Sequence, residues 1–154
     1  MTIRCAGLDF ATKIADFLGI SIEKSETMMK EKGFKQEDNP FLAVLEEETG
    51  KIVKEMQQSV DYFQREFGES IEKIILAGGS SLIPEIDSFF QRRFEKIKVE
   101  IGNPLEKIKR KGGMREEGAV LYSNVIGLAL RGISKNPVKD GINLSPEEIK
   151  SREK

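Results

Sequence analysis

The stretch from residue 74 to residue 84 constrains this chain more than any other part of its sequence. It reads Ile-Ile-Leu-Ala-Gly-Gly-Ser-Ser-Leu-Ile-Pro, an apolar run that opens into two glycines and two small hydroxyl residues before a proline. A strand that meets paired glycines at a helix N-terminus builds a backbone surface able to touch a phosphate or a nucleoside. Free N–H groups at the helix start add to this attraction. Gly78 and Gly79 are therefore candidate binding residues, although paired glycines can also serve the geometry of the turn alone.

The composition excludes several classes of active site. The 154 residues contain no histidine and a single cysteine, Cys5. Histidine-dependent catalysis, Ser-His and Cys-His nucleophiles, His-ligated metals and disulfide frameworks are therefore excluded within this chain. The 25 Lys and Arg residues face 26 Asp and Glu residues, so the total charge does not indicate nucleic-acid binding.

No segment of the sequence is typical of a signal peptide or a membrane span. The longest apolar run, residues 119–130, is interrupted by Ser123 and Asn124 and is shorter than the roughly 20 residues of a transmembrane helix. Together with the single cysteine, this predicts a soluble, cytoplasmic protein. The length suits one domain or two small lobes with a real core.

The first third of the chain is predicted to be helical. Ser21 is expected to cap a helix that runs to about Gly33, and Asn39-Pro40 to start a long helix that stops at Gly68. An earlier helix ends at Gly19. The apolar residues predicted to face the core are Phe10, Ile14, Phe17 and Leu18 in that earlier helix, and Phe41, Leu45, Ile52, Met56, Val60, Phe63 and Phe67 in the long one.

A strand, a helix and a second strand are predicted after Ile71. Residues 74–76 form a continuous apolar run, as expected of a strand buried on both faces, and residues 97–101 alternate as in a strand with one covered face. The intervening helix carries Ile83, Ile86, Phe90 and Phe94 in register. Strands joined in this way are parallel with a right-handed crossover, and ligands gather at their carboxyl ends, where Gly78 and Gly79 lie.

The C-terminal part combines one apolar helix with a polar tail. After a flexible joint at Gly112 and Gly113, residues 119–130 are predicted to form a helix that is apolar nearly all round. Such a helix must be buried, in this chain or against another. Residues 133–154 are expected to form a flexible tail. From Arg92 to Arg115, nine basic residues face three acidic ones, which indicates a solvated surface or, as the weaker reading, a basic face toward an anionic membrane or partner.

Residues 74–84 resemble the adenosine motif of the actin-like ATPase superfamily, and within it the type IV pilus assembly PilM family, which is related to the division protein FtsA. Residues 6–15, Ala-Gly-Leu-Asp-Phe-Ala-Thr-Lys-Ile-Ala, followed by Leu-Gly-Ile-Ser, resemble the family's Gly-Gly-x-Asp-Phe-Thr helix start. Residues 99–105, Val-Glu-Ile-Gly-Asn-Pro-Leu, resemble its second strand and exit loop. Residues 119–132 are similar to its closing helix.

The resemblance implies an α/β chain that holds part of an actin-like (ribonuclease H-like) ATPase fold, mostly helical with a βαβ unit. It implies a helical lobe over residues 4–68, the βαβ unit and closing helix over 69–132, and the tail over 133–154. The family's first phosphate loop, catalytic acid and second phosphate hairpin lie upstream of these residues. We therefore expect no enzymatic activity of this chain, at most weak ATP binding by the chain alone, and ATP as a true cofactor only together with the missing N-terminal half.

The resemblance also implies a set of nucleotide contacts: Gly7, Glu26, Lys30, Gly78, Gly79 and Ser80. The glycine loop would lie against adenosine and phosphates, and Glu26 near the ribose. Three departures from the family pattern alter this pocket. Ala6 stands where the family has its first Gly, Ala11 where it has Thr, and Met29 where it has a Lys three residues after the Glu. Lys30 comes one place late, about 100° further round the helix, so that only its long stem would bring it to the ligand.

In function, the resemblance implies a cytoplasmic scaffold at the inner-membrane platform that assembles type IV pili or related secretion filaments, peripheral to the membrane through its partners. The alternatives are an FtsA-like division or cytoskeletal scaffold and a nucleotide-binding ATPase fragment. Expected partners are platform proteins such as PilN, with self-association through the closing helix as a further option and no nucleic acid. Residues 142–146, Ile-Asn-Leu-Ser-Pro, resemble the Ile-Asn-Leu-Leu-Pro segment with which PilN engages PilM, so the tail would imitate this partner.

Overall fold

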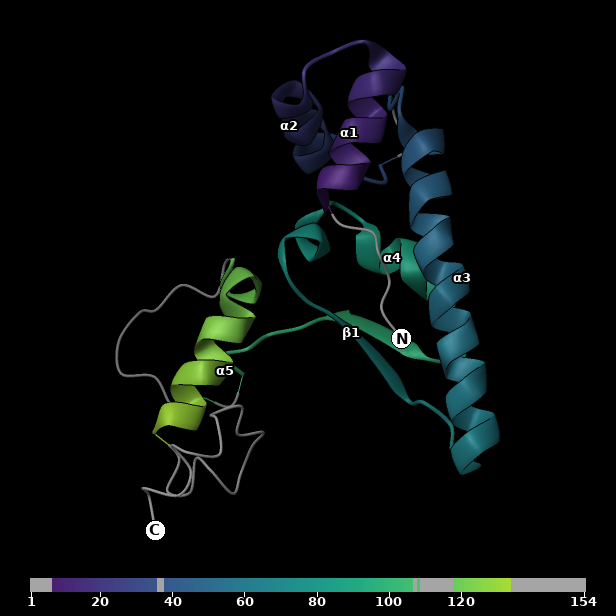
Figure 1. The fold of residues 1–154 in the computed structure, drawn as a ribbon, viewed down its shortest axis with the longest axis vertical. Coiled ribbons are helices and arrows are strands. Elements are labelled where there is room, and N and C mark those ends of the chain that lie inside the picture. Colours follow the sequence, from purple (N-terminus) through teal and green to yellow (C-terminus); the bar gives the residue numbers. More distant parts are fainter. Residues whose placement is uncertain (1–6, 36–37, 107, 109–117, 134–154) are drawn as a thin grey trace, which may run out of the picture.

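The computed structural model describes residues 7–35, 38–106, 108 and 118–133, and the account below refers to these. Figure 1 shows α1 and α2 together at one end, α3 running along the molecule, and a two-stranded sheet with α4 beside it. The fold is α/β and mostly helical, as predicted. In chain order, with η for a 3-10 turn, the elements are α1 (Gly7–Leu18), α2 (Ile22–Lys32), α3 (Leu42–Phe67), β1 (Lys73–Leu76), η1 (Gly79–Leu82), α4 (Ile86–Gln91), β2 (Lys98–Ile101), η2 (Ala119–Tyr122) and α5 (Ser123–Gly132).

The helices α1 and α2 pack against each other across small side chains. The buried face of α1 is centred on Ala11, Ile14 and Ala15, which are at most 4% exposed. The predicted burial of Phe17 is wrong: it is 61% exposed, because it lies on the flank of this face in the last turn of the helix. Ser25 of α2 is fully buried against α1, and its Oγ donates to the Ala11 carbonyl at 2.6 Å.

The predicted starts and stops of these helices are mostly confirmed. Gly19 has a left-handed φ of +64° directly after α1, and the Ser21 side chain accepts a hydrogen bond from the Lys24 backbone N–H at 3.3 Å. Gly68, also left-handed, ends α3. The predicted start of α3 is two residues early: Asn39 forms a turn, in which its Oδ1 accepts from the backbone N–H of Phe41 at 3.2 Å, and the helix begins after it.

The apolar stripe of α3 is buried at its beginning and exposed at its end. Phe41 and Leu45 are at most 1% exposed, and Ile52, Met56 and Val60 pack against the core. Phe67 is 60% exposed, so its predicted burial is wrong. Figure 1 shows the reason: the last turns of α3 extend past the elements on which its first turns pack.

The two strands pair in parallel, in a register from Lys73 opposite Lys98 to Leu76 opposite Ile101, which confirms the parallel βαβ prediction. The prediction that β1 is buried on both faces is wrong. Ile74 packs against the core, whereas Ile75 is 60% exposed. Among the described residues the core lies on only one face of this sheet, so every second side chain of β1 faces solvent.

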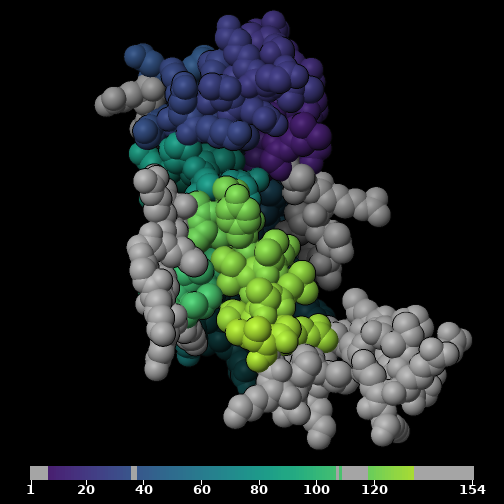
Figure 2. All heavy atoms as spheres, turned by 90° about the vertical axis from the view of Figure 1, so that its left-hand side faces the viewer, coloured from purple at the N-terminus to yellow at the C-terminus, as the bar shows by residue number. Residues whose placement is uncertain are grey.

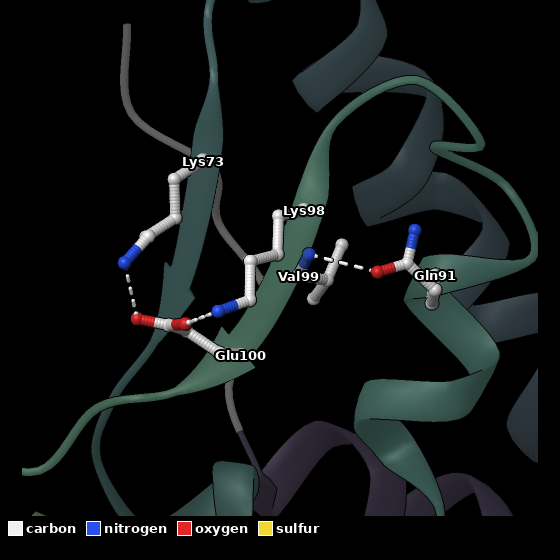
Figure 3. A network of polar contacts seen from close by, with 5 residues as sticks. All are labelled: Lys73, Gln91, Lys98, Val99 and Glu100. Atoms are coloured by element: carbon white, nitrogen blue, oxygen red, sulfur yellow. Dashed lines mark hydrogen bonds and ion pairs between the residues drawn. The ribbon is translucent and has the colours of Figure 1, made fainter.

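A polar network joins α4 to the sheet (Figure 3). Gln91 Oε1 accepts from the Val99 N–H at 2.9 Å, while its Nε2 donates to the carbonyls of the α4–β2 turn at 3.1 Å. Glu100 accepts from Lys73 and Lys98, each at 2.8 Å. The hydrogen bond from Lys73 holds the pKa of Glu100 below its ordinary value, and the same bond raises the pKa of Lys73.

The side chains of α4 and its flanks complete the core as predicted, with one addition. Ile83, Ile86, Phe90 and Phe94 are at most 5% exposed. Phe89 is fully buried as well, and its ring stacks on Phe34 at a centroid distance of 4.3 Å. The guanidinium of Arg93 lies 3.6 Å from the centre of the Phe89 ring.

The predicted C-terminal helix is observed as η2 followed by α5. Ala119 and Val120 of η2 are buried, but no residue of α5 is. Figure 2 shows α5 on the surface, below the α1–α2 pair. None of the described helices is both long and apolar enough to cross a membrane. The predicted joint at Gly112 and Gly113 and the predicted tail beyond residue 133 lie outside the described residues, and the division into lobes stays a prediction.

Candidate functional site

A cavity of about 540 Å³ lies where the start of α1, the middle of α2 and the turns η1 and η2 meet; we call it the glycine-loop cavity. Its wall consists of Gly7, Leu8, Glu26, Met29, Lys30, Gly79, Ser80, Leu82, Ile83 and Leu121. Five of the six residues named from the sequence are in this wall. The sixth, Gly78, directly precedes the wall residue Gly79 and does not line the cavity itself.

The loop after β1 is built differently from the sequence expectation. Gly78 has φ +89° and ψ −176°, a conformation that side chains with a Cβ rarely adopt. A single 3-10 turn follows, in which Ser81 Oγ donates to the Gly78 carbonyl at 2.7 Å. The predicted helix start directly after the glycines is wrong, because Pro84 keeps Ile83 extended and α4 begins only at Ile86. The loop therefore offers an accessible backbone without the dipole of a following helix.

The glycines of this site have different roles. A Cβ on Gly7 would lie 2.9 Å from Ser80 Oγ, so Gly7 allows the first turn of α1 to pack against the loop. A Cβ on Gly79 would meet nothing closer than Leu121 Cδ2 at 3.8 Å. Gly79 therefore leaves room for a ligand at the wall. The chain is helical from Gly7 onward, so this segment does not have the hairpin that would follow a phosphate loop.

The wall that α2 contributes carries two opposite charges. Glu26 and Lys30 are four residues apart, which places them on one face of the helix, and both line the cavity. The stem of Lys30 thus reaches the cavity although the residue comes one place late in the sequence. Met29, which is 6% exposed, supplies an apolar surface between them. Among the described wall residues Lys30 is the only cation.

The apolar walls were not identified from the sequence. Leu8, Leu82 and Leu121 are each 44–61% exposed, and they border the cavity from three separate elements. Leu121 is 42 positions from Gly79 in the chain, and its side chain lies between Gly79 and Gly118 at 3.8 Å from the Cβ position of each. The one indication in the sequence was that the predicted helix over residues 119–130 is apolar nearly all round, so that some of its side chains should contact other residues.

This arrangement can hold a ligand with an apolar ring and polar edges. The volume is within the roughly 300–1,000 Å³ of small-molecule sites. Aliphatic side chains are suited to the faces of a base, the carboxylate of Glu26 can accept hydrogen bonds from sugar hydroxyls, and the backbone at Gly79 is open to close approach. These residues therefore fit the adenosine part of a nucleotide and supply one cation toward its phosphates.

Comparison with known proteins identifies the family of the chain. None of the curated proteins matches the chain. The profile of the type IV pilus assembly protein PilM family matches residues 4–133, which is most of its 154 residues and includes every wall residue of the glycine-loop cavity. The chain therefore belongs to the type IV pilus assembly protein PilM family.

Proposed function

We propose that this chain is part of a cytoplasmic scaffold at the inner-membrane platform of a type IV pilus or related secretion system, and that it carries the adenosine side of an actin-like nucleotide site. The proposed nucleotide site rests on one observation. One cavity is lined by Gly7, Glu26, Lys30, Gly79 and Ser80. These residues belong to α1, α2 and η1, and the fold brings the three elements to one cavity wall.

In this proposal each wall has one task. The backbone of Gly79 and Ser80 lies against the nucleotide, Glu26 accepts from the ribose hydroxyls, and Met29 contacts the base. ATP supplies the phosphates and bridges this chain to the N-terminal half of an actin-like fold. We assign no hydrolytic step to the chain, because the residues at the cavity bind and orient the ligand, and the phosphates extend toward the half that the family places upstream.

The experiment is a titration of the ¹⁵N-labelled chain with ATP, followed by amide chemical shifts. We expect a dissociation constant of about 1 mM or weaker, which corresponds to roughly −4 kcal/mol. The shifts should concentrate at Glu26, Lys30, Gly79 and Ser80. Gly79→Val fills the open space at the wall and should abolish them. Gly50→Val is the matched control, because a Cβ at Gly50 in α3 meets nothing within 4 Å and lies outside the cavity wall.

Micromolar affinity for ATP that Gly79→Val leaves unchanged would show that the nucleotide binds elsewhere. If Gly50→Val abolished the ATP-induced shift changes as completely as Gly79→Val does, the cause would be a general loss of fold. The family match favours the pilus branch over an FtsA-like division scaffold, since the matching profile is that of PilM.

The exposed surface of α5 supports a scaffold role. Its large apolar side chains are solvent-exposed to 45–81%, together with those of η2 and the residue that follows: Leu121, Tyr122, Val125, Leu128, Leu130 and Ile133. A patch of this kind marks a contact with another polypeptide. We expect the chain alone to self-associate through it, measured by size exclusion with light scattering. A monodisperse monomer with protected amides over residues 119–130 would contradict this.

The partner side of the proposal concerns the tail. Residues 142–146 lie outside the described residues, and their likeness to the PilN segment supports a partner that binds PilM as an extended peptide. In a longer relative that carries the tail, deleting residues 140–154 should tighten binding of a fluorescent PilN peptide, because the tail no longer competes. Unchanged anisotropy titrations would leave the tail as a linker.

A further inference from the structure

The outer edge of β2, which faces away from β1, is bonded to a side chain. The N–H groups of Lys98 and Gly102 donate at 3.1 and 2.8 Å to carbonyls of β1 and of the residue before it, so these two residues point toward β1. In a parallel pair the direction alternates along the strand, and Val99 therefore directs its N–H to the other side. There it donates to Gln91 Oε1 at 2.9 Å, and Figure 3 shows the Gln91 side chain beside β2, on the side away from Lys73.

The amide of Gln91 takes the same two backbone groups that a third strand would take. One residue of a parallel neighbouring strand donates its N–H to a carbonyl and accepts from the N–H found two residues further along. Gln91 does both, because its Nε2 donates to the Ile97 carbonyl at 3.1 Å and its Oε1 accepts from the Val99 N–H. Its Nε2 also donates to the Phe94 carbonyl at 3.1 Å. Both polar atoms of the side chain are thus bonded, and the amide fills one strand position beside β2.

Beyond the position that Gln91 fills, the edge of β2 is open. Ile101 is 40% exposed, and by the same alternation its N–H points away from β1. Within the part of the chain that the structure describes, β1 is the only strand paired with β2. Open edge groups are templates for pairing with another strand. The contacts of Gln91 therefore stand between this edge and such a neighbour.

We propose that the Gln91 side chain keeps β2 from pairing with the β2 strand of a second copy, and that loss of its amide exposes a self-complementary edge. Proteins block exposed edges by covering them or by placing side chains that disfavour pairing. Here the block is a side chain that satisfies the edge groups itself. Gln91 and Val99 lie outside the wall of the glycine-loop cavity, so the proposal does not depend on the nucleotide site.

The charges of β2 favour a second copy in antiparallel orientation as the strand that the open edge would take. If Val99 of both copies lies on a two-fold axis, Lys98 of each copy lies opposite Glu100 of the other. Opposite charges in directly opposed positions stabilise an antiparallel pair, and like charges there destabilise it. The sequence of β2 is therefore complementary to itself in this register.

Gln91 occupies the backbone groups that this pairing would use. In the same register Val99 pairs with Val99 of the second copy and Ile101 pairs with Ile97, through groups that point away from β1. The Ile97 N–H is already bonded within the α4–β2 turn. Each remaining hydrogen bond therefore uses a Val99 N–H or an Ile97 carbonyl, and Gln91 bonds both of these groups.

The test compares the full chain with its Gln91→Leu variant by amide hydrogen exchange at β2, because self-association through α5 would mask a change in mass. In the parent chain the Ile101 N–H should exchange at a rate that does not depend on protein concentration. In Gln91→Leu it should slow about fourfold between about 10 µM and about 1 mM protein, as for a dimer with a dissociation constant of about 100 µM. Gln57→Leu is the matched control, because Gln57 is exposed on α3 and its replacement frees no strand edge.

Two charge variants made in the Gln91→Leu chain test the register. Lys98→Glu places a carboxylate opposite each Glu100 and should abolish the dependence on concentration. Adding Glu100→Lys to that variant restores opposite charges across the axis and should restore the dependence.

Several results would overturn the proposal. A Val99 N–H that exchanges in the parent chain as fast as the Ile101 N–H would show that Gln91 does not hold the edge, whether or not the variants fold. An Ile101 N–H that stays independent of concentration in a folded Gln91→Leu chain would show that the edge does not pair with a second copy. Protection that Lys98→Glu leaves unchanged would exclude the antiparallel register, and protection that Gln57→Leu reproduces would make the effect a general one of added leucine.

Discussion

Replacing Gly33 with alanine tests the joint between the α1–α2 pair and the glycine loop. Gly33 follows α2 with φ +52° and ψ −125°, and the next N–H, that of Phe34, donates to the Pro84 carbonyl at 2.9 Å. A Cβ at Gly33 would lie 2.4 Å from the Pro84 oxygen, 2.6 Å from its Cδ and 2.7 Å from its nitrogen. These atoms belong to the backbone and to a closed ring, so they cannot rotate away.

The expected cost follows from two separate effects. Holding a residue with a Cβ in this backbone conformation costs about 1–3 kcal/mol. Forcing an atom into a filled contact costs about 1–3 kcal/mol more. The Gly33→Ala variant should therefore lose about 2–6 kcal/mol, which is a large part of the roughly 5–15 kcal/mol that stabilises a typical domain.

The assay is urea unfolding followed by far-UV circular dichroism, with Gly19→Ala as the matched control. Gly19 also follows a helix with positive φ, +64°, but a Cβ there meets nothing within 4 Å. Gly19→Ala should cost about 1–2 kcal/mol, the penalty of the left-handed backbone alone. If Gly33→Ala and Gly19→Ala destabilise equally, the contact between Gly33 and Pro84 does not hold the two parts together and the reasoning fails.

Three further expectations concern the core and the sheet. Thr49→Val should raise the free energy of unfolding by about 1 kcal/mol, because it replaces an unsatisfied buried hydroxyl with a methyl group; a loss in urea midpoint would show that Oγ1 has a partner. Gln91→Leu should cost about 1–3 kcal/mol, because it leaves the Val99 N–H and two turn carbonyls without their partner; an unchanged thermal midpoint would contradict this. Glu100, whose pKa is lowered mainly by the hydrogen bond from Lys73, should stabilise the fold at neutral pH and cease to do so as the pH falls below the ordinary carboxyl value of about 4.3. The small difference in melting temperature between the parent and Glu100→Gln should therefore disappear in acid and shrink in high salt, whereas a pH-independent difference would exclude the ion pair as its cause.

Much of the local structure could be predicted because its causes are local. Ser21 caps α2 with its own side chain, and Gly19 and Gly68 end helices through their own backbone freedom. The parallel pairing of β1 and β2 follows from the length of the connection between them. At the site, the resemblance of three segments to the PilM family was sufficient to name five residues that line one cavity.

The remaining features depend on which surfaces meet, and a pattern of apolar residues does not specify this. Phe17, Phe67 and Ile75 follow the same periodicities as buried residues, yet they are exposed, because each lies on a face or at an end that no described element covers. Leu121 reaches the glycine loop only because η2 folds back onto it. Periodicity states that a face is apolar, whereas its burial requires a second surface brought there by distant parts of a chain, and only the tertiary structure shows whether that surface is present.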